Sequence, residues 1–283
     1  MSVAELAKIG KVGLRHNLKY PFSLDNQSRP AYFRVAVAEA FVAGFTLRSG
    51  GVSCGPFAAA NMGYGVGDDE AFVTENRSNL LNTAGRFSSL ITCRQVHGNR
   101  CHVVGRRDLD NPEAAALIEA DALLTAEPGI LLGILTADCL PLIMIDKNAR
   151  ALAVVHAGWR GLEQGVAVAA LAELERSFAV PVADISVYAG PAIGACCFTV
   201  GGEVIERFQR LPELQGVSGW YREDDSGFRL DLLAVQKSQL LAAGLASENF
   251  YAVDICTSCH DLCFSYRRDR AITGRQLAFA GIV

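Results

Sequence analysis

Three short segments each place a side chain that can bind a metal at the end of an apolar run. They are RQVHG with His97, LTADCLP with Cys139 and VVHAGWRG with His156. Each run is typical of a strand, and strand ends that meet loops are where α/β proteins build their sites. A histidine in such a place is more often structural than a ligand, and a cysteine often packs as a small hydrophobe. Because the three are far apart in the sequence, only the fold can bring them together.

Two imidazoles and a thiolate suit Zn²⁺, and three protein ligands leave a fourth position for water or substrate. A metal with an open position lowers the pKa of bound water toward about 7, or polarises a carbonyl, imine or hydroxyl. Gln95 and Asp138 lie beside the predicted ligands and are candidates for orienting them, although Asp138 is also typical of a solvated turn. We therefore expect a zinc site at His97, Cys139 and His156, with copper as the alternative metal.

The elements that must position these residues alternate between strand and helix patterns. A long glycine-rich loop is expected at 50–69, followed by a helix at 68–82 that Asp68 or Asp69 caps. The alternation predicts an α/β fold with one domain over 1–283, in which 1–40 is an N-terminal arm or edge element. No element is predicted after Tyr251, where the chain is rich in cysteine and then basic. Strands are expected at 41–47, 90–95, 121–124, 130–135, 140–145, 151–155 and 185–189, and further helices at 162–178, 203–209 and 231–241.

Composition excludes several functional classes. The 283 residues are 51% hydrophobic and 20% charged, so a large core can form, and the net charge of -4 argues against a general nucleic-acid binder. No apolar run is long enough for a membrane span, and the N-terminus has no secretory apolar region. We expect a cytoplasmic protein, a monomer or small homo-oligomer, with no membrane or nucleic-acid partner. Its nine cysteines are then expected to be reduced thiols.

At these residues the sequence resembles the multicopper polyphenol oxidase-like (laccase-domain) family, which is regarded as purine nucleoside phosphorylases. The resemblance runs from about residue 44 to the C-terminus. The ANMG around Asn61 stands where the family more often has SLNLG. The matching segments are GFTLRSGGVSCGPFAAANMGYGVGDD, RQVHG, ADALLT, TADCLPL, AVVHAGWRG, GPAIGACCFTVG, DICTSCH and FSYRRDRAITGRQLAFAGI.

The resemblance implies a single domain with a layered α/β/β/α sandwich of mixed sheets. It implies that His97, Cys139 and His156 are the zinc ligands. It also implies phosphorolysis of purine nucleosides (adenosine, inosine, guanosine and methylthioadenosine), together with adenosine deamination at the same site. Zinc deaminases usually carry an H-x-E glutamate, which this sequence lacks, so the group that protonates the leaving base is left unassigned.

Phosphorolysis needs phosphate near the sugar, and the arginine fork suits phosphate because it binds two oxygens at once. Arg48 precedes the glycine-rich loop, whose N–H groups can form an anion nest, and Arg160 and Arg275 are further candidates. Asn61 is a candidate for hydrogen bonding to the sugar or phosphate. The alternatives are surface ion pairs for the arginines and a turn-forming role for Asn61.

A second group of thiols follows residue 255. CTSCH matches a haem-attachment pattern, but such attachment follows export, for which the chain carries no signal. Cys256, Cys259, His260 and Cys263 could instead bind zinc locally, although a packed thiol turn is favoured. Cys196 and Cys197 are adjacent, and we expect that they cannot easily chelate one metal together.

Three other functions remain open. The first is a cysteine hydrolase or deamidase, with Cys139 as nucleophile and His156 as base. The second is a copper oxidoreductase acting on phenols. Five histidines cannot supply a multi-copper centre, and Met62 and Met144, the internal candidates for an axial ligand, are typical of packing residues. The third is an editing factor in cell-wall precursor synthesis, for which the residues offer no mechanism.

Overall fold

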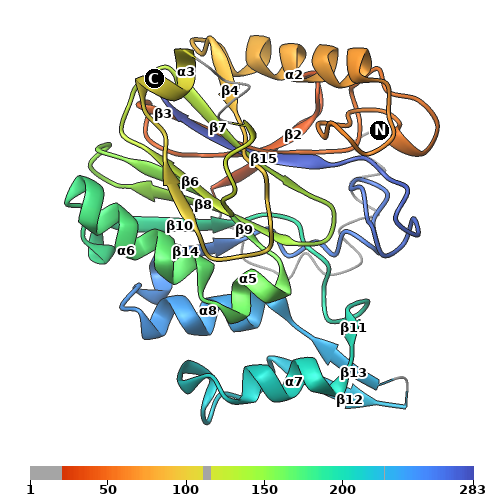
Figure 1. The fold of residues 1–283 in the computed structure, drawn as a ribbon, viewed down its shortest axis with the longest axis vertical. Coiled ribbons are helices and arrows are strands. Elements are labelled where there is room, and N and C mark those ends of the chain that lie inside the picture. The colour runs from red at the N-terminus through yellow and green to blue at the C-terminus, as the bar shows by residue number, and fades with distance from the viewer. Residues whose placement is uncertain (1–20, 111–115, 226) are drawn as a thin grey trace.

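The computed structural model describes residues 21–110, 116–225 and 227–283, so the first part of the expected arm, 1–20, lies outside it. A six-stranded sheet forms the upper half of the molecule in Figure 1. Its last strand pairs in parallel with its neighbour and the other pairs are antiparallel, so the sheet is mixed. The strands are, in spatial order, β1 (Phe22–Asp25), β2 (Tyr32–Val35), β3 (Phe41–Thr46), β15 (Gln276–Ile282), β7 (Ile130–Thr136) and β4 (Ser89–Ile91).

A second mixed sheet of six strands packs against the first. Its two outermost pairs are parallel and its central pairs are antiparallel. The central pair places His156 opposite Pro141, so it fixes the register between two of the sequence segments that carry candidate ligands. The strands are, in spatial order, β14 (Phe250–Ala252), β10 (Ile185–Ala189), β8 (Leu140–Asp146), β9 (Leu152–Ala157), β6 (Ala122–Thr125) and β5 (Cys101–Val103).

Helices cover the outer faces of both sheets, which gives the expected α/β/β/α layers (Figure 1). One helix lies over the first sheet and three lie against the second. Asp69 caps the upper helix by accepting a hydrogen bond from the N–H of Ala71 at 2.8 Å, as expected. The helices are α2 (Glu70–Ala84) above, and α5 (Trp159–Glu163), α6 (Val166–Phe178) and α8 (Leu232–Ala242) below, with short α3 (Arg106–Asp110) beside the sheets.

Alternation along the buried strands builds the layers. In β7, Ile130, Leu132 and Ile134 pack between the sheets, whereas Leu131 packs toward α2. Successive side chains point to opposite faces of a strand, so a continuous apolar run is what a strand covered on both sides requires. The site therefore rests on strands that are buried on both faces.

Several details differ from the sequence prediction. The helix expected at 162–178 is two helices, because Gly165 adopts a left-handed φ of 72° between them. The strand expected at 90–95 ends at Ile91, and the C-terminal β15, which the sequence did not reveal, lies between β3 and β7. The described part of the arm supplies β1 and β2 at the edge of the first sheet.

A smaller unit projects below the sandwich (Figure 1). It pairs a short three-stranded sheet with one helix. The unit consists of β11 (Thr199–Val200), β12 (Tyr221–Asp224), β13 (Gly227–Leu230) and α7 (Gly202–Gln209).

Every helix in 21–110, 116–225 and 227–283 is too short or too polar to cross a membrane.

Candidate metal centre and pocket

His97, Cys139 and His156 come together from three parts of the second sheet and its connections. His97 lies in the loop after β4, Cys139 in the turn between β7 and β8, and His156 within β9. The Cys139 Sγ lies 3.8 Å from the Nε2 of His97, and the two imidazole rings meet edge to face with centroids 4.8 Å apart. One ligand atom from each of the three lies within 4.8 Å of the others. The fold thus assembles the group that the sequence predicted.

Asp121, which the sequence analysis did not single out, fixes both histidines. Its Oδ1 lies 2.7 Å from the Nδ1 of His156, so the Nε2 of that ring is left for the site. The same carboxylate accepts hydrogen bonds from the N–H groups of Val96, His97 and Gly98. These bonds hold His97 in a left-handed conformation with a φ of 60°. A carboxylate that orients a ligating histidine is the usual outer partner in metal sites. The signal in the sequence was the ADALLT segment that leads into β6.

Two glycines explain the spacing of HAGWRG. A Cβ on Gly158 would lie 2.6 Å from the His97 ring and 3.1 Å from the Cys139 Sγ, so only glycine lets the two ligands approach each other there. A Cβ on Gly161 would lie 2.7 Å from the carbonyl oxygen of Gly98, where α5 packs against the His97 loop. The motif therefore supplies one ligand and makes room for the other two.

The protonation states of Cys139 and His156 suit a metal that binds thiolate and imidazole ligands. Burial opposes the thiolate of Cys139, but the charge and hydrogen bonds of His156 and His97 outweigh it and lower the pKa of Cys139 to about 6. Burial alone would lower the pKa of His156, but the Cys139 thiolate and Asp121 raise it to about 9. A thiolate beside two imidazoles is a donor set that Zn²⁺ accepts, and a bound cation takes the place of the imidazolium proton.

The side chains of Asp138 and Gln95 support the site through hydrogen bonds to residues other than its ligands. The Asp138 side chain is buried, accepts a hydrogen bond from the Thr257 hydroxyl at 2.6 Å and another from the Arg267 N–H at 2.7 Å. It is therefore not the solvated turn residue that the sequence allowed. The amide of Gln95 pairs with both backbone groups of Leu135. Gln95 thus fixes the end of β7, and Asp138 ties the turn that carries Cys139 to two distant parts of the chain.

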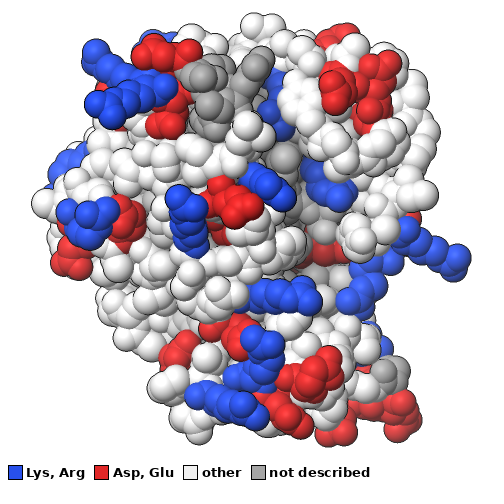
Figure 2. All heavy atoms as spheres, viewed as in Figure 1, with Lys and Arg blue, Asp and Glu red and all other residues white. Residues whose placement is uncertain are grey.

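A cavity of about 600 Å³ opens over the three side chains. Figure 2 shows a hollow on this face with Lys and Arg side chains around it. Arg160, Arg267 and Arg275 line the cavity. Their guanidinium carbons lie 4.3, 5.2 and 5.9 Å from the ring centroids of Trp159, Phe198 and Tyr266, which line it too. The pocket thus combines a candidate metal site with cations and aromatic faces.

Arg48 and Asn61 lie elsewhere. The Arg48 side chain donates to the Ala58 carbonyl at 2.6 Å and lines a separate cavity of about 860 Å³, so the structure does not bring it to the metal pocket. Asn61 is fully buried, and its amide oxygen accepts hydrogen bonds from the N–H groups of Gly63 and Arg275. Its side chain therefore holds the backbone of two pocket residues in place.

The thiols after residue 255 are grouped differently from the sequence prediction. Cys263 is fully buried beside Ala31 and Leu47, away from a local ligand set. The sulfurs of Cys256 and Cys259 instead lie within 4.8 Å of those of Cys196 and Cys197, so the expectation that these two cannot easily share a metal loses its basis. Folding brings the two loops together, which spacing along the chain could not reveal.

Comparison with known proteins adds to this geometry. The family described as multi-copper polyphenol oxidoreductase laccase matches residues 42–283. "Purine nucleoside phosphorylase YlmD" of Geobacillus stearothermophilus is 39% identical over 245 residues, which cover 85% of this chain and 89% of the relative. The crystal structure of YlmD from that organism superposes with a TM-score of 0.85 at 37% identity, over 93% of this chain and 99% of the other. "Adenosine deaminase RL5", from an unknown prokaryotic organism, is 36% identical over 80% of this chain and 87% of its own.

Proposed function

The chain belongs to the multi-copper polyphenol oxidoreductase laccase family, and from this premise we propose that it is a zinc-dependent purine nucleoside phosphorylase with adenosine deaminase activity. The substrates we propose are adenosine, inosine, guanosine and methylthioadenosine, with inorganic phosphate as co-substrate. Relatives named for one activity or the other support purine nucleosides as the substrate class.

The observation that carries the proposal is the group of His97, Cys139 and His156 beneath a cavity lined by arginines and aromatic rings. A purine offers a flat face to aromatic side chains, and phosphate offers oxygens to guanidinium groups. A phenol oxidase could use the aromatic faces but needs no phosphate-binding guanidinium groups. Met62 and Met144 both pack in hydrophobic clusters, which leaves them unsuited as axial ligands.

His97, Cys139 and His156 would hold the zinc ion, which when bound supplies a Lewis acid beside the substrate. Asp121 keeps the Nδ1 of His156 in a hydrogen bond, which fixes the direction of the ring. Asp138 ties the turn before Cys139 to Thr257 and to the backbone of Arg267. These contacts set the positions of the ligands before substrate arrives, which is how an enzyme limits reorganisation during reaction.

Arg160 and Arg275 are the proposed phosphate ligands, with Arg267 added from the cavity lining. Among the described residues, the Arg160 side chain contacts the Trp159 ring and makes no hydrogen bond, so its donors remain available. In phosphorolysis a phosphate oxygen bonds to C1′ of the sugar while the bond from C1′ to the base nitrogen breaks. The base departs with the electron pair and then takes up a proton. Arg48 is left out of this proposal because it lies on another cavity.

The test is incubation of the purified zinc-loaded protein with inosine or adenosine, with and without phosphate. We expect release of the base and of ribose 1-phosphate only with phosphate, and conversion of adenosine to inosine without it. Arg160→Ala should raise the KM for phosphate more than the KM for the nucleoside. Base release at an equal rate without phosphate would refute phosphorolysis.

A second candidate is a cysteine hydrolase or deamidase. Its support is the spatial arrangement in which His156 lies between Asp121 and Cys139. The carboxylate orients the imidazole, which stabilises the thiolate, and this is the arrangement of an activated nucleophile. The two functions differ in their response to metal. Zinc should protect Cys139 from alkylation if the phosphorylase proposal holds, whereas amide hydrolysis by metal-free protein would favour the hydrolase.

A further inference from the structure

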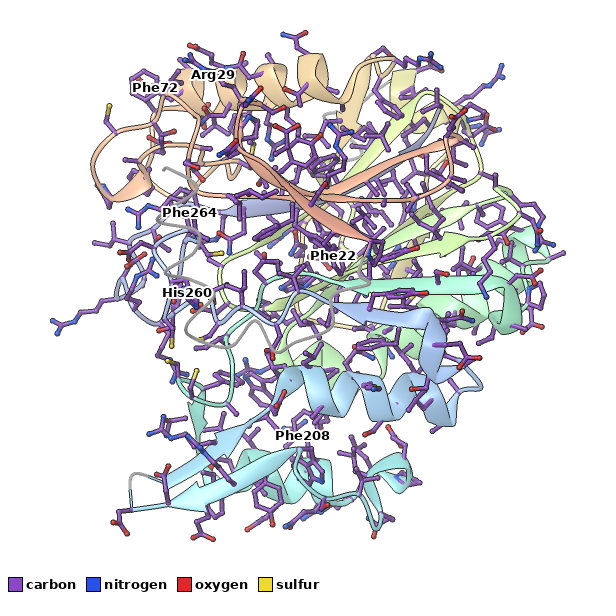
Figure 3. All side chains as sticks on the ribbon, turned by 180° about the vertical axis from the view of Figure 1, so that it is seen from behind. Phe22, Arg29, Phe72, Phe208, His260 and Phe264 are labelled. Carbon is purple, nitrogen blue, oxygen red and sulfur yellow. The ribbon has the colours of Figure 1, made fainter. Side chains whose placement is uncertain are left out.

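Four cysteines outside the metal pocket lie close together on the surface. Cys196 and Cys197 come from the loop between β10 and β11, and Cys256 and Cys259 come from the loop after β14. The Cys259 Sγ lies 3.5 Å from the Sγ of Cys196 and 3.3 Å from that of Cys197. All four sulfurs lie within 4.8 Å of one another. In Figure 3, yellow sulfur atoms gather near the labelled His260, where these loops meet.

These distances match a tetrahedral metal site with four thiolates. A zinc–sulfur bond of about 2.3 Å and tetrahedral angles put neighbouring sulfurs about 3.8 Å apart. A disulfide would need a sulfur pair at about 2.0 Å and would leave two of the four thiols without a role. The Cys256 Sγ also accepts a hydrogen bond from the N–H of Gly194 at 3.2 Å, a contact that favours a thiolate.

Exposure argues against a packing role for these residues. Cys93 and Cys263 are buried, as cysteines that act as small hydrophobes are. Cys197 and Cys256 are half-buried against the core, but Cys196 and Cys259 are exposed, so packing does not account for all four. Four thiols gathered near the surface from two separate loops therefore need another explanation.

Arginines hold the backbone on which the four sulfurs sit. Arg229 donates to the Cys196 carbonyl at 2.8 Å, and Arg267 donates to the Cys197 carbonyl at 3.3 Å. Arg268 donates to the carbonyls of Thr257 and His260. One divalent cation with four thiolates carries two negative charges, because the thiol protons leave to solvent on binding. Arg267 offsets part of that charge, whereas Arg229 and Arg268 are already ion-paired with Asp224 and Asp269.

We propose that Cys196, Cys197, Cys256 and Cys259 form a second metal site, which takes a thiophilic divalent cation such as Zn²⁺ and fastens the two loops together. The site has a structural role, since four protein ligands leave no open position. The two loops also reach the metal pocket. Ile193 donates its N–H to the Asp138 carbonyl at 2.8 Å, and the Thr257 hydroxyl bonds the Asp138 carboxylate. The second metal thus steadies the turn that carries Cys139.

Metal content per chain tests the proposal. We expect purified protein, loaded with Zn²⁺ and dialysed, to hold two equivalents by mass spectrometry of the metal. Cys259→Ser should hold one. The control is Cys54→Ser, an exposed thiol outside both groups, which should still hold two. One equivalent in the wild type, with no loss in Cys259→Ser, would overturn the proposal.

Cobalt substitution assigns the ligands and does not depend on activity. In Cys139→Ser loaded with Co²⁺, the remaining sulfur-to-cobalt charge-transfer band must come from the four cysteines, and adding Cys259→Ser should remove most of it. Wild-type protein itself provides a check if that variant fails to fold. Its intact mass without reductant should show all thiols reduced, whereas loss of two hydrogens through a disulfide within the group would contradict a metal site.

Discussion

Asp121 is the residue on which the geometry of the proposed zinc site most depends. Burial opposes its ionisation, but hydrogen bonds from His156 and from backbone N–H groups outweigh burial and lower the pKa of its carboxyl. Asp121→Asn keeps the shape but removes the negative charge beside His156. We expect metal affinity at the first site to fall by about 10- to 100-fold, the range typical for lost outer partners. Competition with a chromophoric chelator measures this change.

Asp146→Asn is the matched control, because Asp146 is also a fully buried carboxylate but lies at the other end of β8 from Cys139. It should destabilise the fold and leave metal affinity unchanged. Equal loss of affinity in both variants would mean that Asp121 acts through general stability and not through the histidines.

Gly158 tests whether the close approach of His97 and Cys139 is required. Gly158 has an extended backbone with a φ of −69°, which alanine also adopts, so only the new Cβ matters. That Cβ would displace the His97 ring. We expect Gly158→Ala to lower metal affinity by at least 10-fold with little change in folding, measured by the same chelator competition. In Gly105→Ala the Cβ would meet nothing within 4 Å, so this control should bind metal like the wild type.

At the scale of elements, strong local patterns were enough to predict most of the sandwich. The strands at β7, β8, β9 and β10 are long apolar runs, and Asp231 caps α8 by accepting from the N–H of Ala234, as expected. β15 was missed although Gln276–Ile282 is also an apolar run, since its two alanines and its glycine are residue types depleted in strands. Its place between β3 and β7 comes from pairing across the whole chain, which local patterns do not contain.

The sequence predicted the ligands of the site but not the residues that hold them. The three candidate ligands were visible because each interrupts an apolar strand pattern, and the family resemblance pointed to the same positions. Asp121 was missed because an aspartate at the start of an expected strand shows no role until His156 is placed beside it. The grouping of Cys196 with Cys259 depends on two loops that meet only in the folded chain. The sequence indicates which residues are candidate ligands, but spacing does not show which of them meet in the folded chain.

Helix α2 holds the glycine-rich loop through one buried side chain. The amide of Asn76 accepts from the Val52 N–H and donates to the Ser53 hydroxyl and the Asn61 carbonyl. Asn76→Ala leaves buried groups without partners, so we expect the free energy of unfolding to fall by roughly 2–4 kcal/mol. Urea unfolding measures this loss, and hydrogen exchange should rise in the loop. Asn82→Ala, on the exposed side of the same helix, should change stability little.

At the scale of the whole molecule, the two-sheet core supports the open pocket from behind. The pocket lies at strand ends and in loops, while the strands behind it pack between two apolar layers. Cys139 and His156 are therefore placed by β8 and β9, whose register is set by six paired positions. Changes far from the pocket should alter stability before they alter the ligand geometry, because the core and the site share backbone but few side chains.

Acid should unfold the protein through its buried carboxylates, and Asp146 makes this testable. Burial opposes its ionisation, but the side-chain and backbone hydrogen bonds of Arg150 outweigh burial and hold its pKa below the ordinary 3.8. A lowered folded-state pKa stabilises the native state above the unfolded value, and this stability is lost as pH falls through the folded pKa. We expect the free energy of unfolding to decline from about pH 5 toward pH 2.

Asp146→Asn should cost about 2 kcal/mol at pH 7, and the difference from wild type should shrink steadily in acid. Urea unfolding across this range measures both curves, with exposed Glu39→Gln as the control that should parallel wild type. A constant gap between wild type and Asp146→Asn at every pH would show that Asp146 stabilises the fold by packing and not by charge.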